Sequence, residues 1–239
     1  MYKFSFNPYL AVIGDIKKSR KLHDRKETQN KMQEVLTLVN KKYSQDIESD
    51  FMITLGDEFQ GLLNNGKNII NIILEIEQKM GPVNIRFGIG IGEITTGINR
   101  NMPLGADGPA YHNARKVVEF IKNLENKQGT YETSIMISAQ EDNDSLDSLL
   151  NVIFSLCSTI KKSWTARQRE IISAYMECDY NQHKAAAKLG IKQSGVSRAL
   201  LNADYYTYKN GMDKLSSILS KLNHPRLKAE GFGWRLEAD

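Results

Sequence analysis

The sequence predicts an α/β (α+β) fold, in which a mixed, largely antiparallel sheet with helices is followed by a small all-α domain. Three observations carry this prediction. The 239 residues are 41% apolar and 25% charged, an ordinary globular balance. Apolar residues alternate with period two in one clear strand, 83–92, and recur at helical spacing between the strand-like runs. From about residue 143 onward only helical spacing is found.

The first elements are expected to be a strand, a helix and a hairpin. Residues 9–14 form an apolar run that ends at Asp15, which is typical of a buried strand. The dipeptide Gly56-Asp57 is a turn signal between two short apolar runs, so 51–63 is predicted to be a hairpin. The helix between strand and hairpin is predicted from apolar residues at i, i+3, i+4 and i+7: Met32, Val35, Leu36 and Val39.

The next elements repeat this alternation. An isoleucine stripe predicts a helix over 68–80, which Gly81-Pro82 ends. The strand 83–92 carries apolar residues on one face and glycines on the other, and a glycine inside a strand marks the close approach of a backbone or a ligand. A helix over about 109–123 and a strand over about 131–138 complete the order β-α-β-β-α-β-α-β.

Charge and composition divide the chain into three parts. Residues 1–142 balance 18 basic against 18 acidic residues, whereas residues 161–228 carry 13 basic and 5 acidic residues. The polar, acidic stretch 140–145 is predicted to be a linker, and 143–163 a helix that bridges to a helical domain at 164–222. The basic surplus favours contact with a polyanion, and a solvated basic surface is the alternative. We assign no role to 223–239.

Several protein classes are excluded by composition. No apolar run approaches the roughly 20 residues that a membrane span requires. The N-terminus has no long apolar stretch and no cleavage site, so no signal peptide is expected. Cys157 and Cys178 are too few for a disulfide framework, and the four histidines are scattered without metal-ligand spacing. We therefore expect a cytoplasmic protein with no membrane partner.

Two carboxylates end predicted strands. If the hairpin lies beside the first strand, Asp15 and Asp57 emerge at the same edge of the sheet. Two ionised carboxylates that lie close together repel each other unless a cation separates them, and Mg²⁺ is commonly held by one or two carboxylates plus substrate phosphates. The pair therefore predicts a site for Mg²⁺ or Mn²⁺. A helix N-cap for Asp15 and a turn-forming role for Asp57 are the alternatives.

Four motifs occur in a characteristic order. They are Ala-Val-Ile-Gly-Asp-Ile at 11–16, Leu-Gly-Asp-Glu-Phe at 55–59, the glycine-rich strand 86–94 and Gly-Pro-Ala-Tyr-His-Asn-Ala-Arg at 108–115. Together they resemble the core of class III nucleotidyl cyclases, and the second also resembles the diguanylate cyclase signature. The chain is also similar to the bacterial SatD family, up to about residue 220. The similarity lies in Gly14-Asp15-Ile16 with Ser19-Arg20, Asp24-Arg25, Phe51, residues 56–60, Asp107–Ala110, Trp164 and Gln168.

This resemblance implies a ferredoxin-like, nucleotide cyclase-like domain over 1–142 and a helix-turn-helix after it. It implies Asp15 and Asp57 as catalytic metal ligands and Arg115 as the catalytic, phosphate-stabilising residue. Cyclase-like sites form between two protomers, so a homodimer is implied. A purine nucleotide would be bound by residues after the first aspartate and around the hairpin: Ile16, Lys17, Lys18, Ser19, Arg20, Arg25, Gly56 and Gln60. An ordinary basic loop, and a backbone-bonding role for Gln60, stay open.

The chain departs from the cyclase pattern at two positions. Tyr111 stands four residues before Arg115, where cyclases have Asn. Asn113 lies about 160° around the helix from the position of Tyr111. Ile53 stands where adenylyl cyclases have their adenine-selecting Lys. The base-reading site is therefore lost or rebuilt. We expect nucleotide binding with weak or absent cyclisation, because losing one stabilising donor typically costs ~10²–10³ in rate.

The segment 183–200 resembles a helix-turn-helix, with Gly190 in the turn. Lysines are placed to meet DNA phosphates, and the second helix presents polar side chains that can read base edges. The predicted DNA-binding residues are Lys184, Lys188, Lys192, Gln193, Ser194, Ser197 and Arg198. The alternative is a helical hairpin for dimerisation or for docking on the first domain.

Three hypotheses follow. The first is a transcriptional regulator in which a metal-dependent purine nucleotide-binding domain is coupled to a DNA-binding helix-turn-helix. The second is a nucleotide-processing enzyme, cyclase-like or phosphohydrolase-like, whose C-terminal helices form a dimerisation element. The third is a DNA-binding protein whose N-terminal domain is only a dimerisation scaffold.

Overall fold

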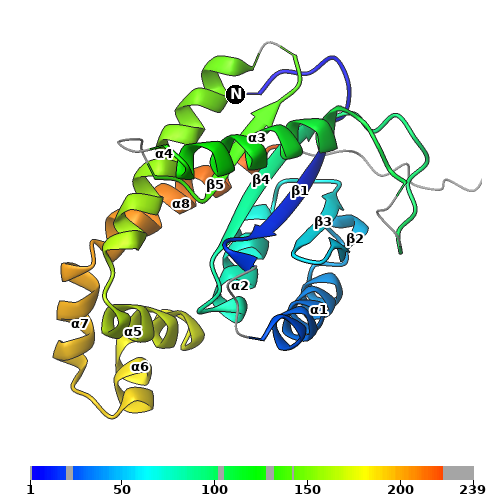
Figure 1. Ribbon diagram of the computed structural model, residues 1–239. Helices are drawn as coiled ribbons and strands as arrows, with labels where there is room; N and C mark the ends of the chain where they lie inside the picture. The colour runs from blue at the N-terminus through cyan, green and yellow to red at the C-terminus, as the bar shows by residue number, and fades with distance from the viewer. Residues whose placement is uncertain (1, 20–23, 102–104, 128–131, 142, 223–239) are drawn as a thin grey trace, which may run out of the picture.

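The computed structural model describes residues 2–19, 24–101, 105–127, 132–141 and 143–222. Within these residues the chain forms one mixed five-stranded sheet, in the order β2-β3-β1-β4-β5, with helices on both faces (Figure 1). The strands are β1 (Tyr9–Ile16), β2 (Ile47–Leu55), β3 (Glu58–Leu63), β4 (Ile85–Gly92) and β5 (Ile135–Ala139). The helices are α1 (Arg25–Lys42), α2 (Ile69–Met80), α3 (Pro109–Glu125), α4 (Asp144–Ser163), α5 (Ala166–Glu177), α6 (Gln182–Leu189), α7 (Gln193–Asn202) and α8 (Tyr205–Leu219).

The predicted α/β class, with an all-α part after the sheet, is confirmed. β1 is the central strand and runs antiparallel to both β3 and β4, while β4 and β5 are parallel. β2 begins at Ile47, four residues before the expected start, because buried Ile47 and Ser49 alternate with more polar neighbours that hide the apolar pattern. The helix α8 was not expected, although its buried residues follow helical spacing.

The two faces of the sheet carry different helices. Leu10 and Val12 of β1 join the large core formed with α1 and α2, whereas Ala11 and Ile13 join a smaller cluster with α3. This division follows from the two-residue period of a strand. Asp15 has the parity of Ala11 and Ile13, so its side chain lies on the α3 face. The sheet therefore directs this carboxylate toward one helix.

The glycines of β4 accommodate the backbone of α3. A Cβ at Gly90 would lie 1.9 Å from the carbonyl oxygen of Ala110, and one at Gly88 would lie 2.3 Å from that of Ala114. Both distances are far below van der Waals contact, so side chains at these positions would force the helix away from the sheet. The sequence left open whether this glycine face meets a backbone or a ligand, and the partner at Gly88 and Gly90 is a helix backbone.

Polar side chains of α4 cover the open edge of β5. The amide of Asn151 accepts a hydrogen bond from the Ile137 N–H at 2.8 Å and donates one to the Ile137 carbonyl oxygen at 2.9 Å. Asp147 accepts from the Ala139 N–H at 2.6 Å and from the Tyr2 hydroxyl at 2.6 Å. These groups substitute for a sixth strand, so α4 protects a sheet edge that would otherwise be free to pair.

The stretch 140–145 is held in place rather than extended. Asn143 is buried, accepts a hydrogen bond from the Lys3 N–H at 3.1 Å and donates to the Lys3 carbonyl oxygen at 3.0 Å. The Ser5 hydroxyl donates to Glu141 at 2.5 Å. Glu141 and Asn143 are therefore fastened to the N-terminal segment, and residues 144–145 already belong to α4. The division into 1–142, 143–163 and 164–222 stays a prediction.

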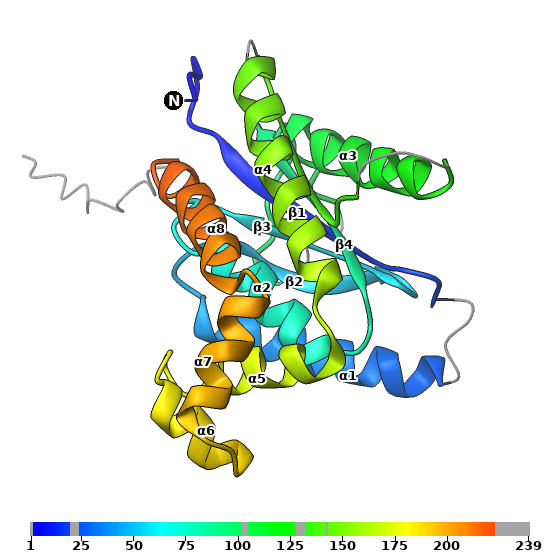
Figure 2. The same ribbon diagram turned by 90° about the vertical axis from the view of Figure 1, so that its left-hand side faces the viewer.

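α5 and α6 begin at clear local signals, whereas α7 and α8 begin without a side-chain cap. Thr165 and Gln168 form a capping box at the start of α5, and the side chain of Asn181 caps α6. Gly190 adopts φ of 64° between α6 and α7, as expected for a left-handed turn residue. α8 then returns to the sheet, where the Gly66 N–H donates to the Leu222 carbonyl oxygen at 2.9 Å, so the helical part packs against α2 and α4 (Figure 2).

Candidate functional site

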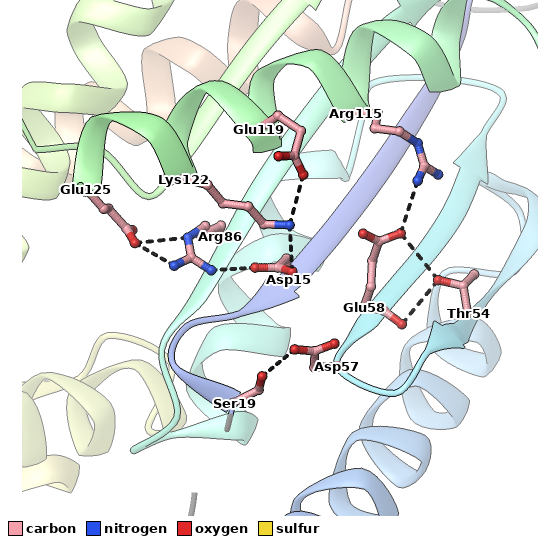
Figure 3. Close-up of polar contacts among 10 residues, drawn as sticks. All are labelled: Asp15, Ser19, Thr54, Asp57, Glu58, Arg86, Arg115, Glu119, Lys122 and Glu125. Atoms are coloured by element: carbon pink, nitrogen blue, oxygen red, sulfur yellow. Dashed lines mark hydrogen bonds and ion pairs between the residues drawn. The ribbon is translucent and has the colours of Figure 1, made fainter. Parts of the chain in front are cut away.

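The end of β1 and the tip of the β2–β3 hairpin lie side by side. The Ile16 N–H donates a hydrogen bond to the carbonyl oxygen of Asp57 at 3.0 Å. Gly56 has φ of 56°, a conformation that favours glycine, and places Asp57 at the turn. Asp15, at the end of β1, and Asp57, at the hairpin tip, thus lie at the same end of the sheet (Figure 3).

Both oxygens of Asp15 are in contact with cations. The guanidinium of Arg86, which lies opposite Asp15 on β4, contacts Oδ2. The ammonium of Lys122 on α3 lies 3.1 Å from Oδ1. The Asp15 side chain is only 8% exposed, so these two contacts replace the water that an isolated carboxylate would need. Asp15 is therefore a neutralised, buried carboxylate and not the N-cap of α1, which is Asp24.

A wider ion-pair network surrounds Asp15. Arg86 also contacts Glu125 at 2.5 Å, Lys17 contacts Glu125 at 2.7 Å, and Lys122 contacts Glu119 at 3.0 Å. Burial alone would lower the pKa of Lys122, but its contacts with Glu119 and Asp15 outweigh this effect and raise the pKa. Burial would raise the pKa of Glu125, but hydrogen bonds from Arg86 and Lys17 outweigh it and lower the pKa. These shifts favour the charged forms of Lys122 and Glu125.

Asp57 has different surroundings. Its Oδ2 accepts a hydrogen bond from the hydroxyl of Ser19, which is itself buried. Lys18, next to Ser19, is exposed and adopts φ of 54°. A side chain at Gly56 would meet the guanidinium of Arg25 on α1. Ser19 and Arg25 thus lie beside the hairpin tip that carries Asp57, whereas Lys17 pairs with Glu125 in the network around Asp15. Arg20 lies outside the described residues.

Arg115 approaches a different carboxylate from the predicted pair. Its guanidinium lies 3.7 Å from Glu58 Oε1, and half of its side chain is exposed. Glu58 lies opposite Asp15 in the sheet, and Thr54 contacts the same carboxyl group (Figure 3). Burial raises the pKa of Glu58, and Arg115 opposes that shift. Arg115 therefore contacts Glu58, the residue of β3 that pairs with Asp15, and not Asp15 itself.

The residues around Arg115 explain the departures from the cyclase pattern. Tyr111 is buried against Ala11 and Ile13, and its hydroxyl has no hydrogen-bond partner within the described residues. Asn113 donates to the Ile91 carbonyl oxygen at 3.1 Å, at the far end of the strand from Asp15. Gln60 is buried in the sheet opposite Ile13. Tyr111, Asn113 and Gln60 are therefore engaged in packing or hydrogen bonding within the fold.

Sequence reasoning missed the cations that hold Asp15. Arg86 was seen only as part of a glycine-rich strand, and its position opposite Asp15 depends on the register of β1 and β4. Lys122 carried a weak signal, because Arg115, Glu119 and Lys122 recur at i, i+4 and i+7 on one face of α3. A helix face with alternating charge, packed over the end of a strand, could have identified the network.

The carboxylate oxygens at this end of the sheet suit a hard cation, but Arg86 and Lys122 already contact both oxygens of Asp15. Carboxylate oxygens are preferred ligands of Mg²⁺ and Mn²⁺. No cluster of three acidic, histidine or cysteine side chains arranged for metal binding occurs in the described ranges. Asp57 offers an oxygen beside the Ser19 contact, whereas Asp15 offers one only when Lys122 or Arg86 leaves. A cation at this edge would therefore compete with Lys122.

The predicted DNA-contacting residues lie on α6, α7 and the turn between them. Lys184, Lys188, Lys192, Ser194 and Arg198 are exposed, and Gln193 and Ser197 are half-buried. Val196 and Leu200 are buried, as expected for the inner face of α7. Three of these residues have side-chain contacts within the chain: Lys188 pairs with Glu177 of α5, Gln193 donates to Gln182, and Arg198 donates to the Ser194 carbonyl oxygen at 3.4 Å.

The solved structures that the chain resembles are cyclase domains. The guanylyl cyclase domain of the RhoGC fusion protein from the fungus Blastocladiella emersonii is 19% identical, with a TM-score of 0.37 over 46% of this chain and 72% of that chain. A bacterial light-regulated adenylyl cyclase is 17% identical, with a TM-score of 0.40 over 55% of this chain and 75% of that one. The guanylate cyclase domain of RhGC from Catenaria anguillulae, solved with GTP, is 18% identical, with a TM-score of 0.35 over 46% and 71%. Likeness at these identities and TM-scores does not assign an activity to the chain.

Two further comparisons concern the chain as a whole. Among curated proteins none matches it. The described helices include none that combines the length and the apolar character of a membrane span. A family model matches residues 9–214, and this agrees with the motifs found in the sequence. The chain belongs to the SatD family.

Proposed function

We propose that this protein is a nucleotide-responsive DNA-binding regulator. Its sheet part binds a purine nucleotide with Mg²⁺ or Mn²⁺ at the edge that carries Asp15 and Asp57, and its α6–α7 unit binds DNA as a helix-turn-helix. The observation that carries the proposal is the meeting of these two aspartates at the end of β1, joined through the Ile16–Asp57 backbone hydrogen bond.

The charges around Asp57 support a phosphate-bearing ligand. Lys18 and Arg25 lie beside the hairpin tip, and the polypeptide turns sharply there at Lys18 and Gly56. Arg and Lys side chains with free donors hold phosphates through charge-assisted hydrogen bonds. A divalent cation held there would supply positive charge against the carboxylates and the phosphates. Asp57 would hold the cation, and Ser19 would keep the Asp57 carboxylate oriented.

Binding without rapid turnover is favoured over catalysis. Phosphoryl transfer depends on donors placed around the transferring phosphate. Tyr111 is committed to the core, and Arg115 is directed to Glu58 rather than to Asp15 or Asp57. A cyclisation reaction would therefore lack one stabilising residue and would need Arg115 to reorient.

The exposed face of α6 and α7 supports DNA as the second ligand. Arg198, Ser194 and Lys192 lie on the outer side of α7 and its N-terminal turn, while Val196 and Leu200 fix the inner side. Arg can pair with the guanine edge in the major groove, and Lys can contact phosphates. The helix-turn-helix would therefore read bases through α7 and contact the DNA backbone through Lys184 and Lys192.

The nucleotide site is tested by calorimetry. ATP, GTP, CTP and UTP are titrated into the wild type with Mn²⁺ and with chelator. We expect metal-dependent binding of one purine nucleotide, lost in Asp57→Asn and kept in Asp107→Asn, a control on an exposed loop carboxylate. Equal nucleotide affinity in Asp57→Asn and the wild type would refute the site. Release of pyrophosphate or a cyclic product, lost in Arg115→Ala, would support the nucleotide-processing alternative.

The DNA part is tested separately by selecting bound sequences from a random library. Arg198→Ala is expected to relax the selected sequence, and Lys209→Ala, on α8, is the matched control. Affinity should fall steeply with salt, because phosphate contacts release counterions. Selection of no sequence, together with flat salt dependence, would refute DNA binding. If nucleotide leaves DNA affinity unchanged, the two parts act independently.

A further inference from the structure

One face of α4 carries exposed apolar side chains. Leu149, Val152 and Leu156 are 57%, 54% and 61% exposed, and they follow one another at spacings of three and four residues. That spacing places them in one row along the helix. α4 runs along the side of the molecule that faces the viewer in Figure 2. Single exposed apolar residues are ordinary, but a contiguous row on one helix marks an interaction surface.

The other faces of α4 are already used. Leu150, Phe154 and Cys157 are buried in the main core. Asp147 and Asn151 bond the edge of β5. Ile153 faces α8, since a Cβ at Gly211 would lie 3.6 Å from it. The row of Leu149, Val152 and Leu156 is therefore the face that the described residues leave uncovered.

The spacing of the exposed residues along this face is the same in both directions. The exposed row is Ser145, Leu149, Val152, Leu156, Thr159 and Ser163. The steps between its members are four, three, four, three and four, as in the seam of paired helices. A second copy in antiparallel orientation, centred between Val152 and Leu156, would place Val152 against the other copy's Leu156. Leu149 then faces the other copy's Thr159, and Ser145 faces Ser163 at each end.

The charges at the ends of α4 fit the same arrangement. Asp144 lies in the first turn and Lys162 in the last, and the row between them is uncharged. In an antiparallel pair, Asp144 of each copy would approach Lys162 of the other copy. Within its own chain, the Lys162 ammonium already contacts Glu132. The opposed helix dipoles add to this preference. A lipid surface fits less well, because the two basic residues of α4, Lys161 and Lys162, lie together in its last turn and its first turn is acidic.

We propose that the protein forms a two-fold homodimer in which α4 packs antiparallel against α4 of a second copy. The same patch on both copies makes the contact self-complementary and closed, as in most soluble dimers. The proposal does not depend on nucleotide or DNA binding, since it uses no residue of either proposed site.

Analytical ultracentrifugation of the full chain tests the dimer. We expect a concentration-dependent dimer whose dissociation constant rises at least about a hundredfold in Leu156→Glu, because the variant buries a charge at the centre of the contact. Leu38→Glu is the matched control, since Leu38 is 52% exposed on α1, away from the row. Thermal unfolding of both variants checks the fold. A wild type that is monomeric, or a dimer insensitive to Leu156→Glu, would overturn the proposal.

Orientation is tested by pulsed electron resonance with a spin label at Ser145→Cys, in a Cys178→Ser background. Cys157 is buried and stays unlabelled. Nine helical residues separate Ser145 from the proposed centre, so an antiparallel pair places the two labels about 27 Å apart along the axis. A parallel pair would place them about 10 Å apart, the distance between helix axes. The short distance would overturn the antiparallel arrangement, and the long one supports it.

Discussion

The ammonium of Lys122 lies 3.1 Å from Oδ1 of Asp15, where α3 crosses the end of the central strand. Arg86 contacts the other oxygen of the same carboxylate. A nearby cation offsets the cost of burying a carboxylate, and here the fold supplies two. The residue first identified as a metal ligand is thus neutralised by its own chain, and any bound cation enters in competition with Lys122.

Replacing Lys122 should strengthen cation binding at this edge. In Lys122→Met the alkyl stem is retained, the ammonium is lost, and Asp15 keeps one partner, Arg86. We expect the affinity for Mn²⁺ to rise about tenfold, equivalent to about 1.4 kcal/mol. Electron resonance of free Mn²⁺ during titration measures this change.

Lys116→Met is the matched control, because Lys116 is exposed on the same helix. It should leave Mn²⁺ affinity unchanged. If Lys122→Met binds Mn²⁺ no better than the wild type, the ammonium and the cation do not compete for Asp15. The lysine would then serve only to stabilise the buried carboxylate.

Local patterns made most of the sheet predictable. β1 and β4 each carry a clear apolar signal, and the turn dipeptide 56–57 fixed the hairpin that brings Asp57 to Asp15. What the sequence could not provide was the register between distant elements. Arg86 reaches Asp15 only because β1 and β4 pair at that register, and Lys122 only because glycines let α3 lie close to the sheet.

Two further features were not predicted: α8, which had a clear signal in the sequence, and the start of β2, which had none. The buried residues of α8 recur at helical spacing from Tyr205 to Leu219, so that helix could have been found. The start of β2 could not, because polar residues at 48–50 break the apolar run while the backbone still pairs with β3. In this stretch tertiary pairing overrides local preference.

The close contact of α3 with β4 predicts a severe effect of Gly90→Ala. The new methyl would lie 1.9 Å from the Ala110 carbonyl oxygen, and backbone cannot yield as a side chain can. We expect the free energy of unfolding to fall by about 3 kcal/mol. Denaturant unfolding measures it. Gly97→Ala is the control, since no atom lies within 4 Å of its Cβ position, and equal stabilities of the two variants would contradict the close packing.

The pairing of Asn151 with Ile137 predicts that the edge of β5 depends on one side chain. Asn151→Ala leaves the Ile137 N–H and carbonyl oxygen without their partners. We expect a loss of about 2–3 kcal/mol in stability and faster hydrogen exchange at the Ile137 amide. Ser148→Ala, at an exposed position of the same helix, should change neither quantity. An Ile137 amide that stays equally protected in Asn151→Ala would show that other groups cover this edge.

The thiol of Cys157 predicts how stability changes at alkaline pH. Burial raises its pKa from 9.0 to about 11, because the thiolate is poorly solvated between α4 and α8. As the pH rises from 9 to 11, the unfolded chain loses this proton before the folded chain does. The free energy of unfolding therefore falls over that range, by up to about 1.4 kcal/mol per pH unit from this group. Cys157→Ala lacks this contribution, so the stability difference between the wild type and the variant should shrink between pH 9 and 11 in denaturant titrations. Parallel curves for the two proteins would mean that the thiol ionises equally in both states.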